Sequence, residues 1–295
     1  MKTKTAMITI AGRPNVGKST LTNYLVGEKI AIVSNKPQTT RNRICGIVTK
    51  DNTQFVFIDT PGYHKARTKL GDYMVNVTRD SIADVDLTIL VVEPIAAIGP
   101  QEEGLIAQIK ERKCPAILAI NKIDTVEKEN LLAVIDAYGQ TGVFDAIVPI
   151  SAKSGENIDD LLKVCGDYAV DGPFLFPEDL TTDQPERQVM AEIIREKILW
   201  CLDREIPHGT AVEITKFSER DNGIIDIDAT IYCEKASHKG IIIGKHGDML
   251  KKISSLARTD CEKFMGTKVY LTTWVKVKEN WRDSDFLIRN FGYSE

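Results

Sequence analysis

The sequence lacks several features that would assign it to a membrane, secreted or metal-binding class. It has no apolar run near the ~20 residues that span a membrane, and the apolar stretch before Gly12 is too short for a signal peptide. Its six cysteines include no C-x-x-C pair, which favours reduced, buried thiols over a zinc site or a disulfide framework. The net charge of −4 argues against a uniformly basic surface but not against a local basic face. We therefore expect a cytoplasmic protein.

The length and the hydrophobic pattern predict two domains. The chain has 295 residues, of which 43% are apolar and 27% charged, enough for two cores. Short Ile- and Val-rich runs alternate with segments of helical length in the first half, at residues 6–12, 54–60, 86–93, 115–121 and 146–152. This alternation is typical of an α/β fold with a mostly parallel sheet. A stretch with three prolines, VDGPFLFPEDLTTDQPER, reads as a linker. We predict one domain over 1–170, a linker over 171–185 and a second domain over 186–295.

The first strand is followed by a complete G-x-x-x-x-G-K-S motif, Gly12-Arg13-Pro14-Asn15-Val16-Gly17-Lys18-Ser19. Its glycines allow successive N–H groups to surround a β-phosphate, while Lys18 reaches the β- and γ-oxygens and Ser19 binds Mg²⁺. A plain Gly-rich turn between a strand and a helix is the alternative. The residues expected to bind the phosphates are Gly12, Asn15, Val16, Gly17, Lys18, Ser19 and Thr20.

Three further motifs follow later strands and indicate guanine as the base. In Asp59-Thr60-Pro61-Gly62, the carboxylate can hold Mg²⁺ through water and the glycine N–H can contact the γ-phosphate. In Asn121-Lys122-Ile123-Asp124, the carboxylate can accept from guanine N1–H and the N2 amine, and adenine has neither donor. Ser151-Ala152-Lys153 can offer a backbone N–H to guanine O6. The expected ligands are GTP or GDP with Mg²⁺.

These four motifs, in this order, resemble the translation-factor-related class of P-loop GTPases. The resemblance implies a Ras-like domain with a switch threonine in Gln38-Thr39-Thr40-Arg41. We favour Thr40, with Thr39 as the alternative. Ser19, Thr40 and Asp59 would then surround Mg²⁺.

The hydrolytic machinery is notable for a missing glutamine. Tyr63 follows D-x-x-G and cannot orient the attacking water in the same way, so slow intrinsic hydrolysis is expected. We interpret Arg13 and Arg41 as surface or switch-loop charges rather than arginine fingers. Resemblance to GTPases with P-N-x-G-K-S implies that Asn15 holds K⁺ beside the phosphates. The alternative is that Asn15 only tolerates a left-handed turn. The residues expected to act in hydrolysis are Asn15, Lys18, Thr40 and Gly62.

The second half predicts an α+β domain around a glycine-bounded loop. The pattern gives a helix over 185–205, two strands joined by the hairpin turn Asp221-Asn222-Gly223, and a helix from about Ser237. Gly244-Lys245-His246-Gly247, a second helix from Asp248 and a strand over 267–278 follow. This order resembles a type II KH domain, whose G-x-x-G loop approaches about four single-stranded nucleotides. A lone G-x-x-G is more often a turn between helices.

Basic residues concentrate in the same region. Residues 235–282 contain eleven Lys and Arg against four Asp and Glu, which suits a polyanion. In the second helix, apolar residues recur at three- and four-residue steps and basic residues occupy the other face. The expected RNA contacts are Gly244, Lys245, His246, Gly247, Lys251, Lys252, Arg258, Lys276 and Lys278.

A GTPase domain followed by a type II KH domain resembles the Era-like family of bacterial ribosome-assembly GTPases, as does the terminal WRDSDFLIRNFGY. The resemblance implies binding to the 3′ end of 16S rRNA, action in maturation of the 30S ribosomal subunit, a monomer, and peripheral contact with the inner face of the cell membrane. Two alternatives are an RNA-modifying GTPase, which modified nucleosides dependent on the protein would reveal, and a membrane-signalling switch. Crosslinks at Lys245 to lipid or protein instead of RNA would favour the switch.

Overall fold

The computed structural model describes residues 2–36, 38–62, 68–81 and 85–293. The chain forms two compact units. Unit 1 is built from three stretches within the first 183 residues, and unit 2 contains the chain from Gln184 onward together with Ile32–Thr39 and a short stretch ending at Asp72. Within the described residues, no helix combines the length and apolar character needed to cross a membrane.

Unit 1 contains a twisted sheet whose central strands are buried on both faces. The strands are β1 (Lys4–Ala11), β2 (Ile44–Lys50), β3 (Thr53–Asp59), β4 (Leu87–Val92), β5 (Ala116–Ile120) and β6 (Ala146–Pro149), in the order β2-β3-β1-β4-β5-β6. Only β2 runs antiparallel to its neighbour on this path. A short β7 (Val170–Asp171) also pairs with β1. The central strands β4 and β5 are continuous apolar runs because both of their faces are covered.

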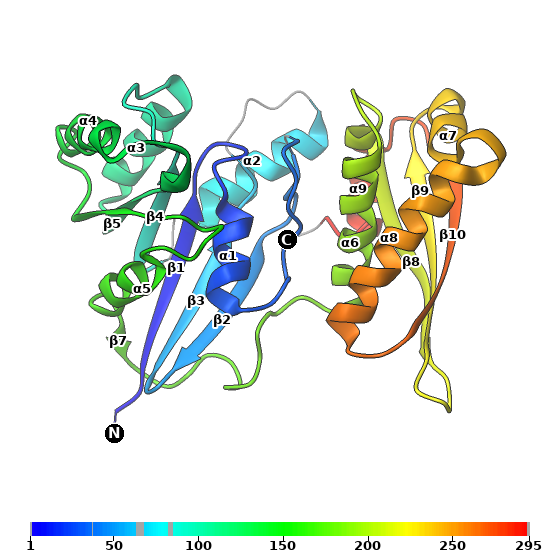
Figure 1. Cartoon of the computed structure of the whole chain (residues 1–295), viewed down its shortest axis with the longest axis horizontal. Coiled ribbons are helices and arrows are strands. Elements are labelled where there is room, and N and C mark those ends of the chain that lie inside the picture. Colours follow the sequence, from blue (N-terminus) through cyan, green and yellow to red (C-terminus); the bar gives the residue numbers. More distant parts are fainter. Residues whose placement is uncertain (1, 37, 63–67, 82–84, 294–295) are drawn as a thin grey trace. The chain divides into compact units, whose positions relative to one another are not determined.

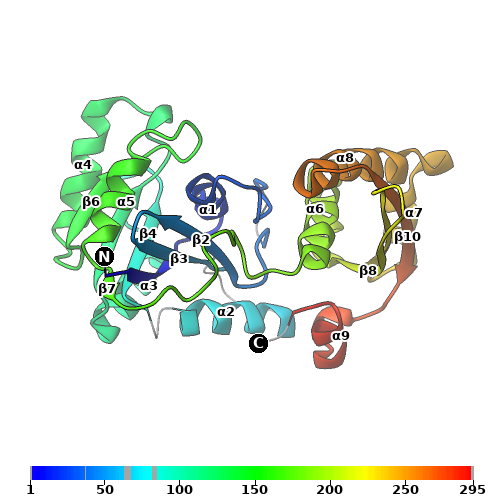
Figure 2. The same ribbon diagram turned by 90° about the horizontal axis from the view of Figure 1, so that it is seen from below.

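Helices cover both faces of this sheet and leave its ligand-binding edge to loops. The helices are α1 (Lys18–Val26), α2 (Lys69–Ser81), α3 (Pro100–Arg112), α4 (Lys128–Gly139) and α5 (Ile158–Gly166), with a short η1 (Ile123–Thr125). One core joins α1 and α5 to the sheet, and a second joins α3 and α4 to it. Figure 2 shows α1 and α2 on opposite sides of β2 and β3. The four nucleotide motifs follow the carboxyl ends of β1, β3, β5 and β6, where ligands bind in such folds.

Unit 2 packs helices on one face of a three-stranded sheet. Its elements are α6 (Glu186–Cys201), β8 (Thr210–Glu219), β9 (Ile225–Cys233), α7 (Ala236–Ile243), α8 (Asp248–Met265), β10 (Val269–Val277) and α9 (Asp285–Asn290). The strand order is β10-β9-β8, with β9 parallel to β10 and antiparallel to β8. Figure 1 shows α6 and α8 side by side beside this sheet, with which they share one core. The predicted fold class is confirmed.

The hairpin between β8 and β9 turns where the sequence predicts. Gly223 has φ +76°, and its N–H donates to the Arg220 carbonyl oxygen at 2.9 Å. A residue with a β-carbon is strained at such a φ, which explains the glycine.

Charged residues of α6 are buried, contrary to their polar appearance in the sequence. Arg195, Glu196 and Lys197 are each at most 1% exposed. Glu196 accepts a hydrogen bond from the Val33 N–H at 2.9 Å and pairs with Lys197 at 2.7 Å. Lys197 also contacts Asp260 of α8. Val33 lies in the segment Ile32–Thr39, so this hydrogen bond ties that segment to the rest of unit 2.

Candidate functional site

The phosphate loop folds back tightly after β1. Gly12 has φ +155° and Gly17 has φ +103°. A β-carbon on Gly12 would lie 2.5 Å from the Val91 carbonyl oxygen, and one on Gly17 would lie 2.2 Å from Asn121 Nδ2. Both positions therefore need glycine for space as well as for conformation.

Lys18 is held inside the loop that it follows. Its side chain is buried, and Nζ donates to the carbonyl oxygens of Gly12 and Arg13, each at 3.0 Å. Burial lowers the pKa of Lys18 to about 8, although the negative charge of Asp59 partly opposes this shift. A phosphate bound here would supply the opposite charge that favours the protonated amine.

Three oxygen-bearing side chains converge beside Lys18. Ser19 Oγ donates to Asp59 Oδ2 at 2.7 Å and lies 2.8 Å from Thr40 Oγ1. The other Asp59 oxygen, Oδ1, is buried and has no hydrogen-bond partner among the described residues. Burial raises the pKa of Asp59 to about 6, opposed by Lys18, Ser19 and the Thr60 N–H. A buried carboxylate oxygen without a partner, beside two hydroxyls, is a suitable donor set for Mg²⁺.

The two candidate switch threonines have different surroundings. Thr40 is buried beside Ser19, whereas Thr39 Oγ1 donates to the Lys36 carbonyl oxygen at 2.6 Å. The geometry thus supports Thr40 as the threonine at Mg²⁺. Gly62 also abuts the phosphate loop, because a β-carbon there would lie 2.8 Å from Pro14 Cα. Tyr63 lies outside the described residues.

Asn121 joins the loops of the expected base pocket. Its Nδ2 donates to the Val16 carbonyl oxygen at 2.7 Å, and its Oδ1 accepts from the Ala152 N–H at 2.9 Å. Asp124 accepts a hydrogen bond from Ser151 Oγ at 2.7 Å and is otherwise exposed. The structure thus brings the three motifs together, with the Asp124 carboxylate at the surface and Asn121 buried between the loops. Lys153 is exposed.

Glu93 also lies in this site, and none of the sequence motifs indicates it. It directly follows β4 and forms ion pairs with Arg13 and with Lys122, the latter at 2.5 Å. Partial burial opposes ionisation, but Lys122 and Arg13 outweigh it and hold the pKa of Glu93 below its usual value. The position of Glu93 at the carboxyl end of a parallel strand was the only sequence signal for it.

Two arginines considered as fingers are held by the protein itself. Arg13 pairs with Glu93 and, at 3.2 Å, with Glu102, which supports the interpretation that it is not a finger. Arg41 is only 1% exposed, so it is a buried residue rather than a surface charge.

Asn15 adopts a left-handed turn conformation, as expected if its role is only to form the turn. Its φ is +67°, and its carbonyl oxygen accepts from Lys122 Nζ at 2.7 Å. Its side chain is exposed. This conformation is compatible with both interpretations, so the K⁺ contact stays a prediction.

The G-x-x-G loop connects α7 to α8 and has a positive φ at three positions. The φ values are +75° at Gly244, +54° at His246 and +84° at Gly247. A β-carbon on Gly244 would lie 2.9 Å from the Met249 N atom, whereas one on Gly247 would meet open space among the described residues. Lys245 and His246 are exposed at the tip. The first glycine is therefore needed for packing, and the loop presents its two basic side chains outward.

The remaining predicted RNA contacts are also accessible. Ile253, Ala257 and Cys261 of α8 are buried in the core of unit 2. Three predicted contacts on α8, one on β10 and one directly after β10 are exposed: Lys251, Lys252, Arg258, Lys276 and Lys278.

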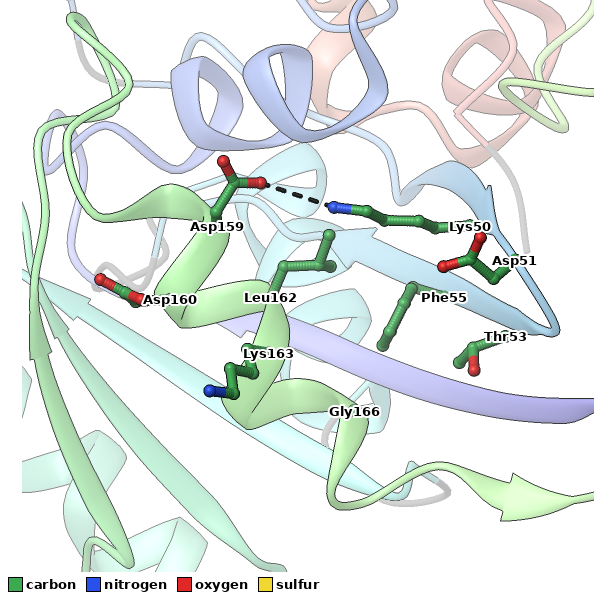
Figure 3. Close-up of a pocket in the computed structure, with 9 residues that line it drawn as sticks. All are labelled: Lys50, Asp51, Thr53, Phe55, Asp159, Asp160, Leu162, Lys163 and Gly166. Atoms are coloured by element: carbon green, nitrogen blue, oxygen red, sulfur yellow. Dashed lines mark ion pairs between the residues drawn. The ribbon is translucent and has the colours of Figure 1, made fainter.

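A separate cavity of about 490 Å³ lies at the other end of the unit 1 sheet (Figure 3). Lys50 pairs with Asp159 across it at 3.6 Å, and Phe55 and Leu162 are among the side chains that line it. It begins near Thr53 at the start of β3, whereas Asp59 ends that strand. None of the predicted site residues lines it.

Together, the folds and sites define a P-loop GTPase domain followed by a type II KH domain. Residues 7–122 match the family model described as "50S ribosome-binding GTPase", and residues 205–282 match the model described as "KH domain". GTPase Era of Ruminiclostridium cellulolyticum is 53% identical, with 99% of this chain and 98% of that protein covered. GTPase Era of Clostridioides difficile is 51% identical, with 99% of each covered. This chain belongs to the Era family of GTPases.

Two solved structures of Era share this architecture. One is Era in complex with MgGDPNP and nucleotides 1506–1542 of 16S ribosomal RNA, and the other is an Aquifex aeolicus Era variant bound to GDP and aluminium fluoride. Each has a TM-score of 0.95 and 38% sequence identity, and covers 99% of this chain and 100% of the other. The prediction of a GTPase from the sequence is confirmed.

Proposed function

We propose that this GTPase binds the 3′ end of 16S rRNA through its KH domain and acts in maturation of the 30S subunit. The observation that carries the proposal is the full-length similarity to an Era that was solved with MgGDPNP and nucleotides 1506–1542 of 16S rRNA. The exposed basic residues around the G-x-x-G loop support it from this chain's own structure.

At the nucleotide site, GTP or GDP would bind with Mg²⁺. Lys18 would neutralise the phosphates, while Ser19, Thr40 and Asp59 would surround the ion. Gly62 would contact the γ-phosphate, and Asp124 would bind the guanine edge. The ion supplies charge stabilisation when bound. We keep K⁺ beside Asn15 as part of the proposal.

The domain boundaries, the oligomeric state and the location of the protein in the cell are also proposals. We propose a GTPase domain over 1–170, a linker over 171–185 and a KH domain over 186–295, in a cytoplasmic monomer. Peripheral contact with the inner face of the membrane also remains a proposal. Flotation of the purified protein with vesicles of anionic lipid tests it, and protein that stays entirely with the unbound fraction would contradict it.

The RNA assignment is tested by crosslinking in growing cells, followed by sequencing of the attached RNA. We expect reads at the 3′ end of 16S rRNA, and these should fall sharply in a Lys245→Ala, Lys252→Ala variant. These lysines are better probes than Gly244, because a side chain at Gly244 would collide with Met249. Lys128→Ala, which removes an exposed lysine from unit 1, is the matched control. Predominant reads from 23S rRNA would refute the small-subunit assignment.

A titration with single-stranded RNA measures the same contacts directly. Each phosphate contact removed should reduce the slope of log affinity against log salt by roughly 0.7. The slope should therefore decrease in the double lysine variant and stay unchanged in Lys128→Ala.

A further inference from the structure

The outer face of β10 carries two large, exposed aromatic side chains. Side chains alternate along this strand, so Val269, Thr273 and Val275 point toward the helices. Thr273 confirms that direction, because its hydroxyl lies 2.8 Å from Ser254 of α8. Tyr270 and Trp274 therefore occupy the opposite face, where they are 60% and 59% exposed.

Two such rings on one solvent-facing strand indicate a binding surface. Trp and Tyr bury large apolar areas when they have a partner. The two residues are four positions apart, which places them about 13 Å from each other along an extended strand. This spacing is too wide for one base, so each ring can stack a base of its own. β10 also forms the edge of its sheet, next to β9, so one side of the strand is open to a ligand (Figure 1).

Cations lie next to the Tyr270 ring, whereas Glu213 lies in the row of Trp274, two strands away. Arg220 lies over the Tyr270 ring, with its guanidinium carbon 5.1 Å from the ring centre. Arg220 also pairs with Asp226 at 2.5 Å, and Lys216 pairs with the same carboxylate at 3.2 Å. Asp226, which lies opposite Tyr270 on β9, is therefore neutralised by two cations. Proteins that bind single-stranded nucleic acid commonly combine cations with aromatic rings, because the cations attract the phosphates and the rings stack on the bases.

The other end of the face continues into residues already assigned to RNA. Lys276 is on the same face as Trp274, two residues further along β10, and Lys278 follows the strand. Asp228 lies opposite Thr272, between the two rings. A carboxylate there repels phosphate, so bases rather than phosphates should cover the middle of the face, with phosphates nearer the lysines.

We propose that Tyr270 and Trp274 stack two bases of single-stranded RNA on the outer face of β10. This inference rests on the proposed RNA-binding function and extends it beyond the roughly four nucleotides that a G-x-x-G loop binds. The surface would add affinity with little sequence preference, because every base has a stacking face.

Two RNA lengths separate this surface from the G-x-x-G loop. One oligonucleotide has about five nucleotides, enough for the loop alone, and the other has about sixteen. Trp274→Ala and Tyr270→Ala should each weaken binding of the longer RNA roughly tenfold and leave the shorter one unchanged. Trp274→Phe should retain most of the affinity. Phe286→Ala, which removes a ring that is 71% exposed on α9, is the matched control and should have no effect.

Tryptophan fluorescence provides a direct readout of stacking. Saturation with the longer RNA should quench the wild type, and the quench should be much smaller in Trp274→Phe although that variant still binds. Circular dichroism checks that each variant folds. The proposal would be overturned if the Tyr270→Ala, Trp274→Ala double variant bound the longer RNA as tightly as the wild type and if that RNA did not quench the wild type. The face would then be a candidate surface for a protein partner. Failure of the wild type to bind either RNA would instead refute the RNA-binding function itself.

Discussion

Replacing Asp124 with asparagine should change the base preference of the GTPase from guanine to xanthine. The Asp124 carboxylate is held by Ser151 Oγ at 2.7 Å through Oδ1, and the side chain is otherwise exposed. In Asp124→Asn the same hydroxyl can donate to the amide oxygen, which leaves the amide NH₂ for the ligand. That NH₂ meets the N2 amine of guanine, donor against donor, but it can donate to the C2 carbonyl of xanthine.

The expected size of the change follows from hydrogen bonds to a charged group, which contribute about 1.5–3 kcal/mol each. Loss of one such bond weakens GTP binding roughly 10- to 150-fold, at about 1.4 kcal/mol per tenfold. Xanthosine triphosphate should regain most of that loss. The assay is competitive displacement of a fluorescent guanine nucleotide by each triphosphate.

Ser151→Ala is the control for this experiment. It removes the hydroxyl that orients Asp124 but keeps the carboxylate, so it should weaken GTP binding without creating a preference for xanthine. A folded Asp124→Asn protein that still prefers guanine by the wild-type margin would show that the carboxylate does not bind the base.

Three further predictions concern the phosphate end of the site. The pH profile of kcat/KM should be bell-shaped: below about pH 6 Asp59 gains a proton and loses Mg²⁺, and above about pH 8 Lys18 loses the proton that attracts phosphate. A flat profile across both limbs would contradict these roles. Hydrolysis should be faster in K⁺ than in Na⁺ at equal ionic strength, and Asn15→Ala should remove the difference; equal rates in both salts for the wild type would leave Asn15 as a turn residue. Asn121→Ala strands the buried partners at Val16 and Ala152, so it should reduce the unfolding free energy by about 2–3 kcal/mol and weaken GDP binding, as measured by urea denaturation and nucleotide titration. Wild-type stability in that variant would refute the joining role of Asn121.

The sequence predicts the elements of this fold well because local chemistry specifies them. Continuous Ile and Val runs identify the buried strands, and the turn at Gly223 and the apolar face of α8 follow from a glycine and a helical period. The nucleotide motifs also reach one edge of the sheet as expected, since each follows a parallel strand.

The sequence does not predict contacts that depend on distant partners. Glu93 binds Lys122, 29 residues away, and Arg13, 80 residues away, so no local pattern identifies it. The burial of the charged residues of α6 is equally hidden from local sequence, because Glu196 accepts its hydrogen bond from the backbone of Val33, 163 residues earlier. A helix that looks amphipathic in isolation is covered on its polar side by a segment from the first half of the chain. Only tertiary structure shows that Arg41 is buried.

The placement of Asn121 separates two tasks that lie only three residues apart in the chain. Asn121 is buried and joins two loops, whereas Asp124 is exposed and is the residue that we propose binds the base. A substitution at Asp124 can therefore alter which nucleotide binds without disturbing the hydrogen bonds by which Asn121 joins the loops. In a cell extract, an Asp124→Asn protein would be inactive with the endogenous GTP that other GTPases use. Added xanthosine triphosphate would activate this protein selectively. The step in subunit maturation that we propose for this protein could then be halted and restarted in that extract.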